Sequence, residues 1–187
     1  MKHIYDIKAG TISLKTAEEI LNTNDILQNK IDLRLQKEQS DTFYGIIDKA
    51  EKVDFSMCNP PFHSSKEEAK KGNHRKNKNL NTPVKTLNFA GISNELVCEG
   101  GESKFIQNMI KESRKFAHNC FWFTTLVSKQ SNLKSIYKAL EKTQATDFKT
   151  IAMGTGNKST RIVAWTYLTA EEQKEWKDTR WKNEESK

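Results

Sequence analysis

The chain has 187 residues and a formal net charge of +7, which predicts one domain with a proper core and favours a polyanionic partner. A lysine-rich solvated surface would explain the same charge. The sequence lacks the roughly 18-residue apolar run of a membrane span. Its 4 histidines do not have the spacing of metal ligands. Its 3 cysteines lack CxxC spacing, which predicts buried free thiols in a reducing cytoplasm.

Residues 1–50 are predicted to form two strands and one helix. Residues 4–9 are a weak strand, and residues 31–36 are a strand with one polar face, because apolar and charged side chains alternate there. Between them, Ser13 is expected to cap a helix over 14–22. The side chains expected to face the core from this region are Leu14, Ala17, Ile20, Leu21, Phe43, Ile46 and Ile47.

Residues 52–58 are predicted to form a short buried strand, which the turn Asn59-Pro60-Pro61-Phe62 ends abruptly. Neither proline can donate a ladder hydrogen bond, and each restricts the residue before it. The Asn59 side chain is therefore held at the carboxyl end of a strand. In open α/β sheets, that edge is where ligands bind.

This turn suits methyl transfer to a planar conjugated amine, such as the exocyclic amine of adenine. The lone pair of that nitrogen is delocalised into the ring, so acceptors must grip its N–H bonds and aim the lone pair at the methyl donor. The Asn59 side-chain oxygen and the Pro60 carbonyl are suitable acceptors, and Phe62 can stack on the base. Positioning then supplies most of the rate. The structural alternative is a rigid turn with no chemistry.

Residues 64–85 are predicted to form a long, mobile, cationic loop, because they carry many lysines and no apolar period. The loop directly follows the Asn-Pro-Pro-Phe turn, so its cations are placed to hold phosphates of a nucleic acid. A solvated loop that contacts nothing is the alternative. The loop residues predicted to bind RNA are Lys70, Lys71, Arg75, Lys76 and Lys78.

The next stretch alternates helices and strands. The segment Glu99–Glu102, Glu-Gly-Gly-Glu, precedes an amphipathic helix over 103–116; its glycines permit a tight start, and its glutamates cap the helix or, alternatively, orient a substrate. A buried strand over 120–127 is followed by a helix that Ser131 or Asn132 caps. The expected core side chains of the two helices are Phe105, Ile106, Met109, Ile110, Phe116, Leu133, Ile136, Tyr137 and Leu140.

Residues 146–153 and 161–168 are the last predicted strands. The joint between them superficially looks like a phosphate-binding loop, but its glycines do not have the required spacing before Lys158, so an antiparallel hairpin explains it better. Lys158 and Arg161 are expected to add to an RNA-binding surface. The remaining residues form a charged helix or tail that starts with a capping box at Thr169.

Several strings occur in a fixed order along the chain. They are Cys58 to His63, Leu87-Asn88-Phe89, Cys98 to Glu102, Trp122-Phe123-Thr124, Leu126-Val127-Ser128, Gly156-Asn157-Lys158 and Ala164-Trp165-Thr166. The Asn-Pro-Pro-Phe turn resembles motif IV of the amino-methyltransferases that use S-adenosylmethionine. Together, over about residues 12–168, the strings resemble the bacterial 23S ribosomal RNA adenine N6-methyltransferases of the F type, relatives of the human U6 snRNA adenine methyltransferase.

The resemblance implies an α/β, Rossmann-like class I methyltransferase fold with strand order 3-2-1-4-5-7-6, whose last strand pair is antiparallel. On that plan the chain begins near strand 2, so the first strand and its Gly-rich cofactor turn have no counterpart. We therefore expect the C-terminal part of a longer methyltransferase, which binds S-adenosylmethionine weakly or not at all by itself. Residues 1–168 are the expected catalytic domain, and residues 169–187 a charged C-terminal helix.

The residues implied as catalytic are Asn59, Pro60, Pro61 and Phe62, and those implied to bind the cofactor are Asn59, Asp6 and Gln39. The implied function is N6-methylation of an adenine in ribosomal RNA by a cytoplasmic monomer that uses S-adenosylmethionine and no metal. A degenerate fold that binds RNA without catalysis is the alternative, which the missing first strand favours for this chain alone. A methyltransferase acting on DNA or a glutamine amide is a third, which the Glu-Gly-Gly-Glu and Gly-Asn-Lys segments disfavour.

Overall fold

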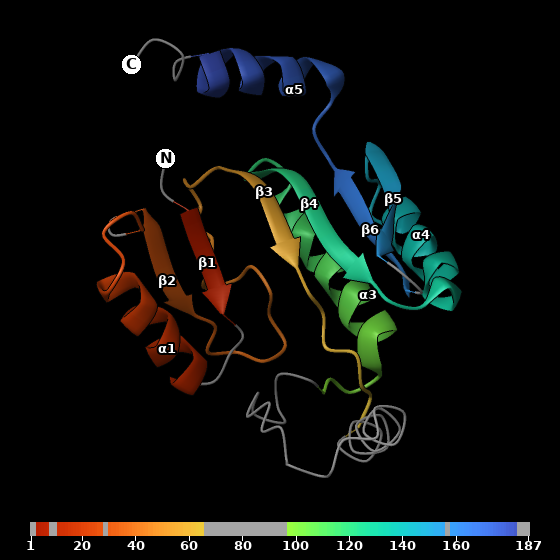
Figure 1. The fold of residues 1–187 in the computed structure, drawn as a ribbon. Helices are drawn as coiled ribbons and strands as arrows, with labels where there is room; N and C mark the ends of the chain where they lie inside the picture. The colour runs from red at the N-terminus through yellow and green to blue at the C-terminus, as the bar shows by residue number, and fades with distance from the viewer. Residues whose placement is uncertain (1–2, 8–10, 28–29, 66–96, 156–157, 183–187) are drawn as a thin grey trace. The chain divides into compact units, whose positions relative to one another are not determined.

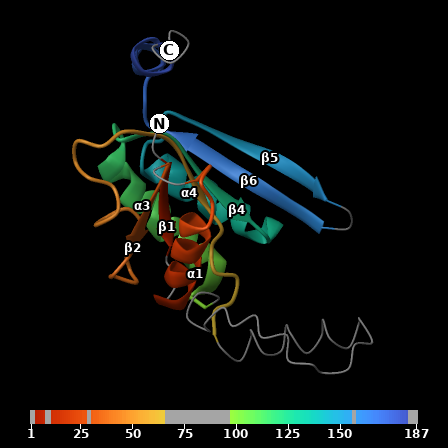
Figure 2. The ribbon, with the colours of Figure 1, turned by 60° about the vertical axis from the view of Figure 1, so that its left-hand side comes forward.

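The computed structural model describes residues 3–7, 11–27, 30–65, 97–155 and 158–182. The chain divides into two compact units, formed by Met1–Ile46 with Pro61–Phe105 and by Ile47–Pro60 with Ile106–Lys187. Figure 1 shows the ribbon, and Figure 2 shows it turned about the vertical axis. No helix in the described part of the chain is long and apolar enough to cross a membrane.

The first unit contains a two-stranded parallel sheet. Strand β1 (His3–Ile7) pairs with strand β2 (Ile31–Leu35) along its whole length. Helix α1 (Thr11–Asn22) connects the two strands and packs against β2. A parallel pair needs such a crossover, because a tight turn can join only antiparallel strands. The predicted strand-helix-strand order is confirmed.

Two details predicted for this unit are wrong. Helix α1 begins at Thr11, so Ser13 lies inside the helix and does not cap it. Ile20 was expected to face the core, but its side chain is 53% exposed. Leu14, Ala17 and Leu21 of α1 are only half-buried, whereas Phe43 and Ile46 are buried as expected.

The second unit is built on a four-stranded mixed sheet. Its strands are β3 (Val53–Cys58), β4 (Cys120–Val127), β5 (Asp147–Thr155) and β6 (Lys158–Thr166). They lie in the order β3-β4-β6-β5, with β3 parallel to β4 and β6 antiparallel to both of its neighbours. The predicted hairpin between the last two strands is confirmed, although both strands extend further into the joint than expected.

The two strand orders match two stretches of the order expected for a Rossmann-like methyltransferase. The pair β2-β1 corresponds to 3-2, and β3-β4-β6-β5 corresponds to 4-5-7-6, with β6 as the antiparallel strand. The strand expected between these stretches is not among the described strands. The fold is therefore the expected α/β fold, with its sheet present as two separate hydrogen-bonded parts.

Helices α3 (Gly101–Ser113) and α4 (Leu133–Lys142) supply most of the apolar cover of the second unit. A 3₁₀ turn, Gln130–Asn132, precedes α4, and Asn132 makes no side-chain capping hydrogen bond, so the capping prediction is wrong. The predicted core side chains that are buried are Phe105, Ile106, Met109, Ile110, Phe116, Ile136 and Leu140. Leu133 and Tyr137 are only half-buried.

Polar groups inside this core are paired with one another. The Trp165 indole N–H donates to the Ser113 hydroxyl oxygen at 3.0 Å, and the Tyr167 hydroxyl donates to the carbonyl of Ile110 at 3.1 Å. Trp165 also stacks on Phe123, with 5.7 Å between ring centroids. These bonds fix α3 against β6, because leaving any of these buried groups unpaired costs about 1–3 kcal/mol.

The sequence predicted three buried cysteines, but only one of them is buried. Cys120 is buried, and its burial raises the pKa of the thiol to about 12. Cys58 and Cys98 are free thiols as expected, but they are only half-buried. Cys120 is therefore a protonated core residue at neutral pH, and it takes no part in thiolate chemistry.

The C-terminal helix is attached to the start of β3 through one carboxylate. Helix α5 (Ala170–Trp176) begins with the predicted capping box between Thr169 and Glu172 and continues as a short π-helix, Lys177–Trp181. The indole N–H groups of Trp176 and Trp181 both donate to Asp54 Oδ1, at 2.8 and 2.9 Å. The Arg180 Nε atom lies 3.5 Å from the same oxygen.

These partners change the acidity of Asp54. Burial works to raise the pKa of the carboxyl, but the two indole N–H bonds and Arg180 outweigh it, so the pKa lies below its usual value of 3.8. A depressed folded-state pKa means that Asp54 contributes stability above the unfolded pKa. That contribution declines as the pH falls from about 3.8 toward the lower folded-state value.

We expect the stability difference between the wild type and Asp54→Asn to be largest near neutral pH and to shrink below about pH 4. The measurement is urea denaturation of both proteins at a series of pH values. Asp25→Asn is the control, because Asp25 is a solvent-exposed acid outside this cluster. A difference that stays constant down to pH 2 would contradict the role assigned to the Asp54 charge.

Candidate active site

The Asn-Pro-Pro-Phe turn leaves the sheet at the carboxyl end of β3. Cys58, the last residue of that strand, pairs with Thr125 in the parallel ladder between β3 and β4. One step earlier, the Thr124 hydroxyl donates to the Ser56 carbonyl at 2.7 Å. The position at which Asn59 begins is therefore set by a strand that is hydrogen-bonded to the sheet, rather than by a free loop, as the sequence predicted.

Exposure differs sharply along the turn. Asn59 is exposed and can be reached by a ligand, whereas Pro60 is buried and Pro61 and Phe62 are half-buried. An accessible amide oxygen beside a partly covered aromatic ring fits the predicted grip and stack. The Pro60 carbonyl, the second predicted acceptor, belongs to a buried residue, so a substrate could reach it only if the residues over it move.

The chain beyond the turn is tied to the start of α3. His63 and Val97 form a parallel bridge, and the Cys98 N–H donates to the His63 carbonyl at 3.0 Å. The Gly101 N–H then donates to the Cys98 carbonyl at 2.7 Å. No local pattern in the sequence signals this pairing, since the two segments are far apart along the chain.

Two glycines make that junction possible. Gly100 and Gly101 have φ angles of +79° and +64°, in the left-handed region that favours glycine. A Cβ on Gly100 would lie 2.6 Å from the Cβ of Lys104. The predicted tight start of α3 is confirmed. Glu102 is buried in the first turn of this helix, where a carboxylate favours the positive end of the helix dipole.

Gly100→Ala is expected to destabilise the protein by about 1–3 kcal/mol, because the new Cβ would be strained by both the backbone angle and Lys104. The measurement is chemical denaturation followed by circular dichroism. Gly154→Ala is the matched control, since a Cβ at that position meets nothing within 4 Å. Equal stability of the two variants would show that the segment can relax around the alanine.

The predicted cofactor residues lie in the first unit. Asp6 is in β1, opposite Arg34 of β2, and its side chain is outside the described part. Gln39 is exposed in the turn after β2. The Gln36 amide donates to the Tyr44 carbonyl at 2.8 Å and bridges the ends of that turn. Asp6 is thus the last residue but one of β1, and Gln39 follows β2.

The predicted RNA-binding residues are only partly described. Arg161 lies in β6 opposite Val127, the last residue of β4, and its Nη2 donates to Gln130 at 3.4 Å. Its Nη1 atom is buried without a hydrogen-bond partner among the described residues. Lys158 begins β6, but its side chain is outside the described part. The loop residues Lys70, Lys71, Arg75, Lys76 and Lys78 all lie outside it as well.

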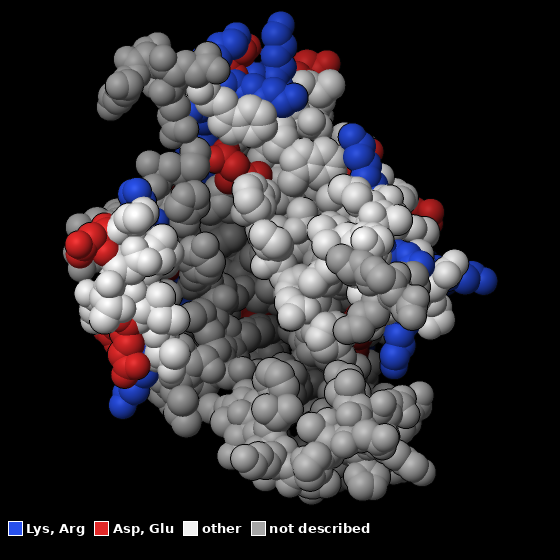
Figure 3. Space-filling view, viewed as in Figure 1, with Lys and Arg blue, Asp and Glu red and all other residues white. Residues whose placement is uncertain are grey.

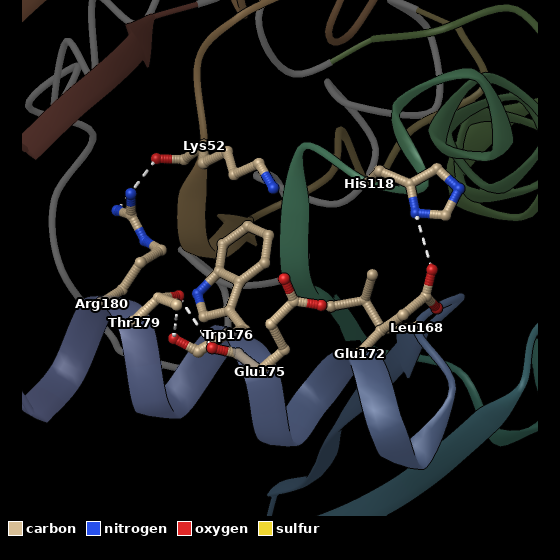
Figure 4. A pocket seen from close by; sticks show the side chains of 8 residues that line it. All are labelled: Lys52, His118, Leu168, Glu172, Glu175, Trp176, Thr179 and Arg180. Carbon is tan, nitrogen blue, oxygen red and sulfur yellow. Dashed lines mark hydrogen bonds and ion pairs between the residues drawn. The ribbon is translucent and has the colours of Figure 1, made fainter.

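A pocket of about 220 Å³ lies beside α5, at the other end of the parallel strands of the second unit (Figure 4). Its wall includes Lys52 and His118, which precede β3 and β4, so it is at the amino ends of the parallel strands. The Lys52 and Arg180 cations lie 5.0 and 5.3 Å from the Trp176 ring centroid, and His118 Nδ1 is 3.4 Å from Glu172. The pocket does not include any residue of the Asn59 turn.

A sequence model of a family described as RNA methyltransferase matches residues 6–169. The chain belongs to this family. The ribosomal RNA large subunit methyltransferase F of Cytophaga hutchinsonii is 49% identical over 174 residues, which are 91% of this chain and 54% of the relative. The protein of the same name from Photobacterium profundum is 46% identical over 91% of this chain and 56% of its own length. The chain thus spans about half the length of these relatives.

Solved structures share the fold. The catalytic domain of human METTL16 in complex with an RNA hairpin of the MAT2A 3′UTR has a TM-score of 0.74 and 21% identity, over 90% of this chain and 56% of that one. The N-terminal domain of human METTL16 in complex with SAH has a TM-score of 0.63 and 16% identity, over 90% and 53%. At these identities the likeness establishes the Rossmann-like methyltransferase fold alone.

Proposed function

We propose that this chain carries the catalytic turn of an S-adenosylmethionine-dependent enzyme that methylates N6 of an adenine in large-subunit ribosomal RNA. The observation that carries the proposal is the exposed Asn59 at the carboxyl end of β3, fixed by the ladder to β4. The family and the names of the bacterial relatives support ribosomal RNA as the substrate class. Residues 1–168 form the proposed catalytic domain, followed by the C-terminal helix.

The turn acts by holding the adenine amine. The Asn59 amide oxygen accepts one N–H of that amine, and the Pro60 carbonyl accepts the other after local movement. Phe62 lies flat on the base and keeps the amine in line. With its N–H bonds held, the nitrogen lone pair rotates out of conjugation and points at the methyl donor. No strong base is required, since the nitrogen loses its proton only after the new bond forms.

The cofactor, when bound, supplies the methyl group. On the residues present, Asn59 would contact it at the end of β3, and Asp6 and Gln39 would contact it at the ends of β1 and β2. The sequence has no Gly-x-Gly-x-Gly string, and Gly10 is the only glycine before Gly45. The 187 residues thus offer polar side chains for part of the cofactor but no glycine cradle, and they fit it incompletely.

RNA binding is proposed for the basic residues that follow the turn in the sequence and for Lys158 and Arg161. The cations of residues 70–78 follow it in sequence, and Arg161 lies at the carboxyl end of β4. The Arg161 guanidinium is a planar donor group of the kind that holds phosphate oxygens. Contacts of this kind hold the backbone of the nucleic acid, while the Asn59 turn reads the base.

A second candidate function applies to residues 1–187 by themselves. Without a glycine cradle they would bind RNA but turn over no cofactor. The observation that favours this alternative is the incomplete fit just described. An assay of methyl transfer separates the two functions. An enzyme transfers methyl groups to the RNA that it binds, whereas an RNA-binding module binds the RNA without transferring them.

Asn59→Ala is expected to reduce methyl transfer about a hundredfold or more in any form of the protein that methylates RNA, because one oriented contact to the reacting group is worth about 3 kcal/mol. Phe62→Ala should also be damaging, and Phe62→Tyr milder, since stacking needs only a flat ring. The measurement is single-turnover incorporation of labelled methyl groups into ribosomal RNA. RNA affinity, measured in parallel, should change little in Asn59→Ala.

Asn24→Ala is the control, because Asn24 is exposed in the turn between α1 and β2, before the first residue of β2. Wild-type turnover by Asn59→Ala would remove the turn from the mechanism. An equal loss of turnover and of RNA affinity would instead assign Asn59 to binding.

Replacing Lys70, Lys71, Arg75, Lys76 and Lys78 together by Ser is expected to weaken RNA binding for every sequence. The slope of log affinity against log salt should flatten by about 0.7 for each single-strand phosphate contact that is lost. The measurement is a salt titration of RNA binding. The matched control replaces five exposed cations of the same charge by Ser: Lys111, Lys115, Lys134, Lys138 and Lys142. Identical slopes for both variants would place the RNA footprint elsewhere.

A further inference from the structure

Strand β3 leads into the Asn-Pro-Pro-Phe turn, but it has few apolar anchors. Phe55 and Met57 are 62% and 76% exposed, so the sequence prediction of a buried strand is wrong at both positions. Strand side chains alternate between two sides, so Asp54, Ser56 and Cys58 lie on the other side of β3, where they are half-buried. That side offers polar groups and a thiol to the rest of the second unit. Hydrogen bonds therefore hold β3 more than apolar packing does.

Residues 170–181, which we call the C-terminal clamp, contact both β3 and β4 near their amino ends. The indole N–H groups of Trp176 and Trp181 donate to Asp54 of β3 at 2.8 and 2.9 Å. The same two rings pack on Phe121 of β4, with 5.8 and 5.1 Å between ring centroids. The register of the parallel ladder places Asp54 level with Phe121. One pair of aromatic rings thus holds the two neighbouring strands at the same height.

Arg180 adds charged contacts to the same end of β3. Its Nη2 donates to the Lys52 carbonyl at 3.2 Å, and its Nε lies 3.5 Å from Asp54 Oδ1. Hydrogen bonds to a carboxylate are about twice as strong as those between neutral groups. In the space-filling view, most of the surface over β3 and β4 is uncharged, whereas Lys and Arg side chains gather over α5 (Figure 3). The charged ties of β3 are thus concentrated at its amino end.

A tie at one end of a strand constrains the position of its other end. A strand rises about 3.3 Å per residue and barely stretches, so a shift of Asp54 along β3 is passed on to Asn59. The ladder to β4 fixes which residues pair, but it tolerates shifts of about 0.5 Å, because hydrogen bonds form over a range of distances. A reacting group misplaced by about 1 Å can lose a hundredfold in rate. The ladder alone therefore leaves a freedom of the size that affects catalysis.

We propose that the C-terminal clamp is a positioning element of the active site and that Asp54 is its positioning residue. Through Asp54, the clamp fixes β3 along its own axis against β4, so that Asn59 meets the adenine amine at the required distance. The clamp holds the amino end of β3 and Asn59 follows the carboxyl end, so the clamp acts through the strand and not on the substrate. The proposal rests on the proposed function, because it assigns the clamp to the aim of a catalytic Asn59.

The first test compares two variants that each lose one hydrogen-bonding group and keep an aromatic ring. Trp181→Phe removes an indole N–H from Asp54. The matched control is Tyr137→Phe, which removes the hydroxyl that lies 2.7 Å from that of Thr150 and joins α4 to β5.

Nuclear magnetic resonance of the ¹⁵N-labelled chain measures the side-chain amide signal of Asn59, identified by its absence from Asn59→Ala, and the hydrogen exchange of the backbone amides. Trp181→Phe is expected to move the Asn59 signal and to speed exchange at residues 55–58 about tenfold, while exchange in β6 stays slow. Tyr137→Phe should do neither. A role in overall stability alone would speed exchange in β3 and β6 alike and leave the Asn59 signal in place.

The second test is single-turnover methyl transfer at saturating RNA, in a form of the protein that methylates RNA. Trp181→Phe is expected to transfer methyl groups about tenfold more slowly, with unchanged RNA affinity, and Tyr137→Phe at the wild-type rate. Asp54→Ala should lose more, because both indoles lose their acceptor. Asp54→Asn should lose less, because its amide oxygen still accepts from them. If Asp54→Ala does not fold, Trp181→Phe decides, since Trp181 is 39% exposed and its ring is replaced by another.

Two results would overturn the proposal. One is an Asn59 signal and a β3 exchange rate that are the same in Trp181→Phe and in the wild type. The other is an equal loss of methyl transfer in Trp181→Phe and Tyr137→Phe, which would reduce the clamp to a source of general stability. If the wild type transfers no methyl group, the proposed function fails. The Asn59 signal and the exchange of β3 then still decide whether the clamp positions Asn59.

Discussion

The parallel ladder between β3 and β4 is the interaction on which the candidate site depends. It sets where Asn59 leaves the sheet, and the Thr124 hydroxyl bound to the Ser56 carbonyl adds a side-chain tie to the same two strands. Strand β4 is held in turn by the stack of Phe123 on Trp165 and by the helices behind it. The position of a catalytic amide is thus traced back to an apolar core that contains no catalytic group.

The other end of β3 is fixed by charge and hydrogen bonds rather than by apolar packing. Asp54 collects two indole N–H bonds and the Arg180 guanidinium, all from the C-terminal segment. A carboxylate that accepts several hydrogen bonds is hard to replace, because its removal leaves each of its donors without this acceptor. Asp54 is far in sequence from the residues that donate to it, so the sequence alone predicted only a charged C-terminal helix with a capping box.

Local patterns predicted most of the fold, because the helices and strands of this chain follow their apolar periods closely. Residues 120–127 and the buried face of α3 are as expected. The errors in burial have one cause. The period shows which side chains are apolar but not what they meet, so Phe55, Met57 and Ile20 were assigned to a core that does not reach them. The His63–Val97 bridge and the Asp54 cluster join distant segments and have no local signal.

The exposure of Phe55 and Met57 also bears on catalysis. A reacting group has to be held to within about 0.5 Å, and its support has to be rigid. In this chain β3 has firm support from β4, while Phe55 and Met57, just before Asn59, face solvent. A strand supported on one face and one edge keeps freedom to bend away from its neighbour. Cover over Phe55 and Met57 would therefore sharpen the aim of Asn59, even though it makes no contact with the adenine.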